Sequence, residues 1–138
     1  MLEEFIEVNK LKAKIFPSDE RNQNLPLVKS IVLVDSNEEP LLVILLSEDK
    51  IDFGKIKKVL KVKDVKLADP KQVFEMTGYK VGGVPPISIY GIKTIIDKKV
   101  VKLKEIVCGG GTPENLMQIS VKEIMENVEE IITEDISK

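Results

Sequence analysis

The chain has 138 residues, a formal net charge of −2, one cysteine and no histidine. This length predicts a single domain over residues 1–138 that buries about two-thirds of the surface of its unfolded chain. The lack of histidine excludes Ser-His-Asp and Cys-His catalysis, and one cysteine excludes a disulfide framework or a multi-cysteine zinc site. No apolar run reaches the ~20 residues of a membrane span and the start is unlike a signal peptide, so we expect a cytoplasmic protein without a membrane partner.

The first part of the chain predicts a short helix at residues 1–8 and an alternating strand at 10–16. The polar segment 17–26 is typical of a loop. Two aliphatic runs follow, at 28–34 and 41–46, and a turn-rich segment separates them. This pattern predicts an antiparallel hairpin that is buried in the core.

Two capped helices are predicted next. Asp52 is a suitable N-cap for a helix that runs to residue 60. After a short strand at 65–68, the run Asp69-Pro70-Lys71-Gln72 predicts a capping box at the start of a second helix, which ends at Gly78.

The remaining pattern predicts strands at 87–90, 93–96, 105–108 and 116–119. Residues 97–99 are typical of a turn. Ser120 and Glu123 predict a capping box for a C-terminal helix, whose apolar stripe extends to Ile132. The order of elements predicts an α/β domain of the α+β type, with one mixed, largely antiparallel sheet flanked by helices.

Charge is unevenly distributed along the chain. Residues 50–66 hold seven lysines against two aspartates, whereas residues 123–135 hold six acidic side chains and no basic one. The basic stretch could face phosphates. The alternative is that both stretches are solvated faces of a sequence rich in lysine and glutamate.

The loop at residues 78–86 combines three glycines with two adjacent prolines. Gly82 and Gly83 can adopt positive φ and let another molecule approach the backbone, while Pro85 and Pro86 make the rest of the loop stiff. A rigid loop with bare N–H groups suits a carbonyl or phosphate oxygen. Composition alone is equally compatible with a plain connection between a helix and a strand.

Three segments together resemble the YbaK-type aminoacyl-tRNA editing family: residues 28–33 (VKSIVL), 67–79 (LADP to TGY) and 81–86 (VGGVPP). This family includes the insertion domain of bacterial prolyl-tRNA synthetase and its free-standing relatives. Gly82 to Pro86 is similar to the family's G-x-x-x-P loop, and residues 109–115 (GGGTPEN) to its second glycine-rich loop. The chain departs from the family before the lysine strand, where only the loop at 18–26 replaces a longer region with a Thr/Ala-rich helix that walls the pocket.

The resemblance implies a mixed α/β domain that hydrolyses the ester of mischarged aminoacyl-tRNA, without a metal or cofactor. Lys29 would supply positive charge and Gly82 a close backbone approach, as the catalytic residues. The implied substrate-binding residues are Gly83, Val84, Pro85, Pro86, Cys108, Gly109, Gly110, Thr112 and Asn115. The implied partners are the 3′ end of mischarged tRNA, with cysteine, alanine or serine most readily on tRNA(Pro), and an aminoacyl-tRNA synthetase. We expect a monomer.

Several alternatives stay open at this stage. Because an aminoacyl ester is already activated, water or the substrate's own 2′-hydroxyl can attack it if the site positions it well. Lys29 could instead be an edge-strand residue, Cys108 a buried small residue at a strand end, and Asn115 a turn residue. The alternative function is a non-catalytic module that binds aminoacyl-tRNA or a nucleotide and acts with a synthetase.

Overall fold

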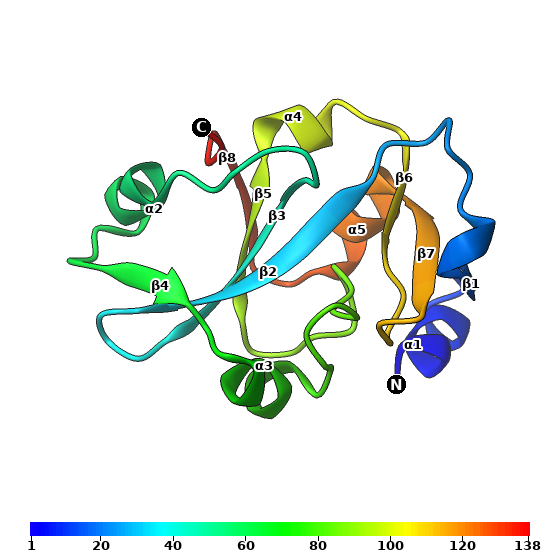
Figure 1. The fold of residues 1–138 in the computed structure, drawn as a ribbon, viewed down its shortest axis with the longest axis horizontal. Helices are drawn as coiled ribbons and strands as arrows, with labels where there is room; N and C mark the ends of the chain where they lie inside the picture. Colours follow the sequence, from blue (N-terminus) through cyan, green and yellow to red (C-terminus); the bar gives the residue numbers. More distant parts are fainter.

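The computed structural model describes residues 1–138 and divides the strands between two sheets (Figure 1). The three-stranded antiparallel sheet has the order β1 (Lys14–Pro17), β7 (Asn115–Ser120) and β6 (Glu105–Gly109). The five-stranded mixed sheet has the order β4 (Val65–Leu67), β2 (Val28–Asp35), β3 (Pro40–Leu46), β5 (Lys93–Asp97) and β8 (Ile131–Glu134). The α+β class is confirmed.

The prediction of one sheet is wrong, because β6 and β4 share a single edge of β2. A parallel bridge between Leu27 and Val107 places β6 at the start of this edge, and β4 pairs with its end from Leu33 onward. Between these two points, the edge of β2 pairs with neither β6 nor β4. The two sheets therefore meet only at the bridge, and the strands diverge from it (Figure 1).

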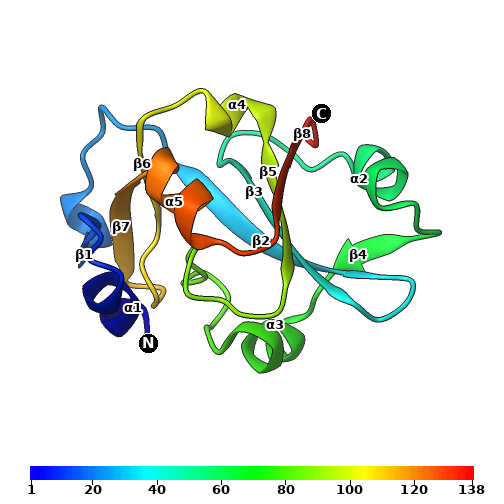
Figure 2. The ribbon, with the colours of Figure 1, turned by 180° about the vertical axis from the view of Figure 1, so that it is seen from behind.

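The helices lie around these sheets: α1 (Leu2–Val8), the 3-10 turn η1 (Ser18–Glu20), α2 (Phe53–Leu60), α3 (Pro70–Thr77), α4 (Lys98–Val101) and α5 (Val121–Asn127). Both views place α1 beside the three-stranded sheet at one end of the molecule and α2 beyond β4 at the other (Figures 1 and 2). No helix has the length and apolar character that crossing a bilayer requires.

Most predictions for the first half are confirmed in type and position, but the strand predicted at 10–16 is β1 at Lys14–Pro17, and the predicted loop at 17–26 contains η1. The hairpin of β2 and β3 forms with Lys29 opposite Leu45. Asp52 caps α2 by accepting the N–H of Lys55 at 3.2 Å. The capping box of α3 is complete, since Asp69 and Gln72 each accept the other's backbone N–H. These elements depend on neighbouring residues, which the sequence shows directly.

Three predictions for the second half are wrong. The last helix ends at Asn127, and the apolar residues after it form β8, which pairs in parallel with β5 and covers its open edge. The predicted turn after β5 is the short helix α4, because the Asp97 side chain accepts the N–H of Lys99 and starts a helical turn. The segment 87–90 is not a strand, since Ser88 has a φ of 65° that breaks an extended chain.

The five-stranded sheet separates two apolar clusters. Val28 and Val32 of β2 lie in the larger cluster, which fills the space toward the three-stranded sheet. Leu33 lies in the smaller cluster, and Ile31 packs against it. The central strands are thus apolar on both faces, which explains why their sequences are continuous aliphatic runs without alternation.

Candidate functional site

The two glycine-rich loops lie against each other, and glycine permits this contact. The N–H of Gly111 donates to the carbonyl of Gly83 at 2.9 Å. A Cβ at Gly83 would lie 2.6–2.8 Å from the backbone of Thr112, and a Cβ at Gly109 would collide with the carbonyl oxygen of Val84. Both positions require a residue without a side chain. The structure therefore brings the first loop and its predicted facing wall together.

Backbone N–H groups without an internal acceptor flank the bond between these loops, at Gly82 and Thr112. Gly82 has a φ of 91°, and both Gly82 and Thr112 are exposed to solvent. Neither residue donates its N–H to an acceptor within the protein. Pro85 and Pro86 are buried beneath them and hold the first loop in place. The arrangement can accept a carbonyl or phosphate oxygen without first breaking an internal hydrogen bond.

Lys29 lies near the bridge that joins the two sheets. Leu27, two residues before it, is the bridge partner of Val107, which lies two residues before Gly109. Lys29 alternates with Val28 of the larger cluster, so it lies on the face of β2 that carries the smaller cluster. The Lys29 ammonium donates to the carbonyl of Asp49 at 2.6 Å, which directs the side chain toward the turn after β3. A catalytic role for Lys29 stays a prediction.

Cys108 is buried in the core, so the expected contact between its side chain and a substrate is wrong. The side chain is fully buried in the larger cluster, on the side opposite Gly109. Its thiol donates to the carbonyl of Met117 at 3.5 Å. Burial raises the pKa of the thiol far above its ordinary value, which removes it as a nucleophile. The alternative of a buried small residue at a strand end describes Cys108 correctly.

We expect the Cys108 thiol to react with an aromatic disulfide reagent only as fast as the folded chain opens. The buried thiol is protonated at neutral pH because its pKa is raised, and the reagent needs a thiolate. The reaction rate, followed by absorbance, should therefore rise steeply with urea. A fast reaction in buffer without urea would contradict this burial.

Asn115 is half-buried at the first position of β7 and closes the turn of the second loop. Its N–H donates to the carbonyl of Thr112 at 3.2 Å, while its side chain makes no hydrogen bond within the protein. Gly110 packs against the backbone of Leu116, where a Cβ would come within 2.6–2.7 Å. These two residues shape the second loop, and their contact with a substrate stays a prediction.

The segment before β2 closes the site in a way that no local pattern indicates. The N–H of Ser18 donates to the carbonyl of Glu114 at 2.9 Å, which ties the start of the segment to the second glycine loop. The N–H of Val107 donates to the carbonyl of Pro26 at 2.9 Å, which ties its end to β6. Both bonds join residues that are far apart in the sequence. They make the segment at 18–26 a third wall beside the two loops.

The lysine-rich stretch lies at the other end of the molecule. It includes α2, which both views place far from the turn between β6 and β7 (Figures 1 and 2). Lys55 of this stretch is occupied by an ion pair of 2.9 Å with Asp135 and a bond to the carbonyl of Ser137. The part of the stretch around α2 is therefore separate from the candidate site, whereas Lys50 directly follows Asp49.

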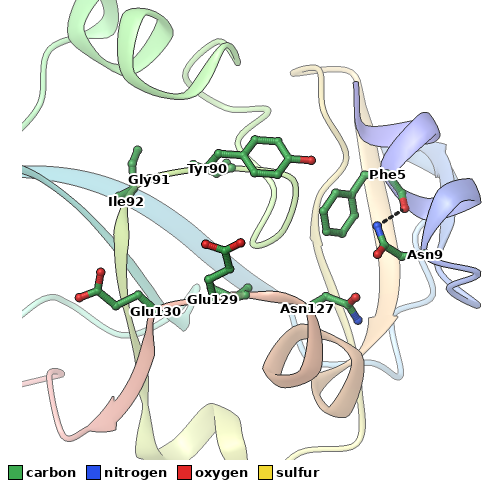
Figure 3. A pocket seen from close by; sticks show the side chains of 10 residues that line it. Phe5, Asn9, Tyr90, Gly91, Ile92, Asn127, Glu129 and Glu130 are labelled. Carbon is green, nitrogen blue, oxygen red and sulfur yellow. Dashed lines mark hydrogen bonds between the residues drawn. The ribbon is translucent and has the colours of Figure 1, made fainter.

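A further cavity of about 320 Å³ lies between α1, the segment 89–92 and the end of α5 (Figure 3). The rings of Phe5 and Tyr90 line it with their centroids 6.3 Å apart, and Glu129 and Glu130 add negative charge. None of the predicted site residues lines this cavity. It is distinct from the contact between the glycine loops.

A family model and two curated proteins match this chain. The model of the aminoacyl-tRNA editing domain matches residues 20–126. The proline–tRNA ligase of Halalkalibacterium halodurans is 31% identical over 87 residues, which cover 63% of this chain and 15% of the ligase. That of Desulfotalea psychrophila is 33% identical over 84 residues, covering 61% and 14%. The chain thus spans only a small part of the length of these curated relatives.

Two solved structures share the fold. A candidate trans-editing enzyme for prolyl-tRNA synthetase has a TM-score of 0.83 at 23% identity, covering 99% of this chain and 94% of that one. A protein described as hypothetical has a TM-score of 0.85 at 23% identity, covering 99% of each chain. The family match includes Lys29 and both glycine loops, and the shared fold covers almost the whole chain. This chain therefore belongs to the aminoacyl-tRNA editing domain family.

Proposed function

We propose that this domain hydrolyses the ester bond of mischarged aminoacyl-tRNA in trans, with Cys-, Ala- or Ser-tRNA, most readily on tRNA(Pro), as the substrate. The observation that carries the proposal is the pair of N–H groups of Gly82 and Thr112, which have no acceptor within the protein and belong to exposed residues beside the bond between Gly83 and Gly111. Ester hydrolysis develops negative charge on the carbonyl oxygen. Backbone donors that are already oriented stabilise this charge without reorganising during the reaction.

Lys29 would contribute the positive charge of the site. Its ammonium is held by a neutral acceptor, the carbonyl of Asp49. A phosphate or a developing oxyanion would compete well for this ammonium, because a hydrogen bond between two charged groups is stronger than one to a neutral carbonyl. Water or the 2′-hydroxyl of the terminal ribose would attack the ester, since the chain has no histidine to act as a base.

The test is the rate of ester loss from Cys-, Ala- and Ser-tRNA(Pro) with the wild type, Lys29→Ala and Gly82→Ala. We expect Lys29→Ala to slow deacylation about 100-fold, the usual effect of removing one group that stabilises an oxyanion. Gly82→Ala keeps the N–H, but the φ of 91° strains a side chain and the methyl group hinders close approach of the substrate, so its deacylation should be slower as well. Lys122→Ala, at an exposed position on α5, should keep the wild-type rate. Thermal melts would show that the variants fold.

The outcomes separate the parts of the proposal. A wild-type rate for Lys29→Ala would exclude the role of Lys29 and leave that of the loops. No hydrolysis of any substrate by the wild type would exclude the enzyme. The second candidate, a module that binds aminoacyl-tRNA without turnover beside a synthetase, is favoured by the internal bond that already occupies the Lys29 ammonium. It predicts saturable tRNA binding with no loss of the ester.

A further inference from the structure

Arg21 is the only arginine among the 21 basic residues of the chain, and the protein leaves its guanidinium without a full set of partners. Its Nε is buried and has no hydrogen-bond partner. None of the four salt bridges includes Arg21, although Asp19 and Glu20 directly precede it. A buried donor without an acceptor is costly and uncommon in folded proteins. Because Nε is closed to solvent, an external acceptor would meet the terminal NH2 groups of the half-buried Arg21, which have no partner within the protein either.

Arg21 lines an open groove of about 530 Å³ between the segment 21–27 and the end of β3. The amide side chains of Gln23 and Asn24 and the hydroxyl of Ser47 also line this groove. They can donate hydrogen bonds to an oxygen-rich ligand. Glu48 is the one acidic residue in the lining.

The walls of the groove are held in place by hydrogen bonds. The N–H of Asn24 donates to Oδ1 of Asn22 at 2.9 Å, which forms a tight turn just after Arg21. The N–H of Ser47 donates to the carbonyl of Leu27 at 2.9 Å, which joins the two walls. The groove is therefore formed before any ligand arrives.

Two lysines stand next to this groove. Lys29 follows the lining residue Leu27 by two positions, and its ammonium reaches the carbonyl of Asp49. The ammonium of Lys99 lies 3.1 Å from the carboxylate of Asp49, which is 18% exposed. Three cations thus face the two carboxylates of Glu48 and Asp49 around the end of β3. Lys99 pairs with a carboxylate, whereas neither Lys29 nor Arg21 does.

We propose that Arg21 binds a phosphodiester group of the RNA backbone in this groove, close to the 3′ end whose ester lies at the glycine loops. The proposal rests on the proposed function, which makes tRNA the substrate. A guanidinium presents two parallel N–H donors to one phosphate, whereas an ammonium acts as a point charge. The segment that carries Arg21 is tied to the second glycine loop by the bond between Ser18 and Glu114. The bond between Pro26 and Val107 ties its other end to β6, two residues before Gly109. Arg21 would position the substrate and take no part in the chemical step.

The test is equilibrium binding of uncharged tRNA(Pro), followed by fluorescence anisotropy, with the wild type, Arg21→Lys and Arg21→Gln. We expect Arg21→Gln to weaken binding roughly 30-fold and to lower the slope of log affinity against log salt by about one. Arg21→Lys should have the wild-type slope but only part of the wild-type affinity, because lysine keeps the charge and lacks the two parallel N–H donors of a guanidinium. Lys122→Gln is the matched control, and thermal melts check the fold.

Binding of a second RNA tests which part of the tRNA carries the phosphate that Arg21 contacts. With tRNA that lacks its single-stranded 3′ end, the wild type should bind more weakly and Arg21→Gln should make no further difference. An equal loss on both RNAs would place the contact elsewhere on the tRNA and overturn the proposal, as would wild-type affinity in Arg21→Gln. Because binding is measured without an ester, a wild type that binds tRNA through Arg21 but hydrolyses nothing would refute the enzyme and leave the phosphate contact standing.

Discussion

Gly109→Ala is expected to lower the free energy of unfolding by about 3 kcal/mol and the melting temperature by about 10 °C. The new methyl group would collide with the carbonyl oxygen of Val84, and Gly83 lies just beyond it. Neither contact partner is a flexible side chain, so a loop or β6 has to move. Because this movement separates the first loop from its facing wall, deacylation should fall together with stability.

The matched control for this substitution is Gly91→Ala. Gly91 has a φ of 73°, and a Cβ there would meet nothing within 4 Å. This variant therefore measures backbone strain alone, at about 1 kcal/mol. Urea unfolding of both variants and the wild type gives the comparison. If Gly109→Ala costs no more than Gly91→Ala, the two loops adjust freely and the close packing at the site has little energetic weight.

Asp97→Ala is expected to destabilise the protein by about 3 kcal/mol as well, far from the glycine loops. Asp97 is 1% exposed. One carboxylate oxygen accepts the N–H of Lys99 at 2.9 Å and caps α4, and the other accepts the N–H of Ile136 at 3.0 Å. Alanine removes the cap and leaves a buried N–H without an acceptor. Thermal and urea unfolding would measure the loss.

Asp97→Asn separates the two contributions. Asparagine can still cap α4 with its amide oxygen, but its NH2 group would face the N–H of Ile136, so about half of the loss should remain. A variant as unstable as Asp97→Ala would assign most of the effect to Ile136 and the C-terminal segment. A variant as stable as the wild type would show that neither of the two hydrogen bonds requires a carboxylate.

The parts of the fold that depend on neighbouring residues could be predicted from the sequence. Asp52 and Asp69 cap helices because their partners lie three residues away. Ser120 also caps α5, but the expected return bond from its own N–H to Glu123 is absent. One carboxylate oxygen of Glu123 accepts the Ser120 hydroxyl at 3.5 Å, and the other accepts the N–H of Lys12 at 3.0 Å. A partner so distant in sequence leaves no local signal.

The end of the chain and the site also show the difference between partners that are close in sequence and partners that are distant in sequence. The apolar spacing of Val128 and Ile131 fits a helix, and only pairing with the open edge of β5 makes the residues from Ile131 onward a strand. Two glycine-rich loops could be predicted to face each other, and they do. The groove at Arg21 could not be predicted, because a missing hydrogen-bond partner is visible only in the folded protein.

The pairing of β1 with β7 has a consequence for how the site comes into being. Lys14 pairs with Gln118, so these strands meet only after about a hundred intervening residues have been arranged. Contacts this distant along the chain make folding slow, and partly folded forms lack them. The tie between Ser18 and Glu114 follows directly from this pairing, since Pro17 lies opposite Asn115. In a chain still emerging during synthesis, the segment around Arg21 and the second glycine loop would therefore not yet be in contact. The site would be complete only after β1 and β7 have paired.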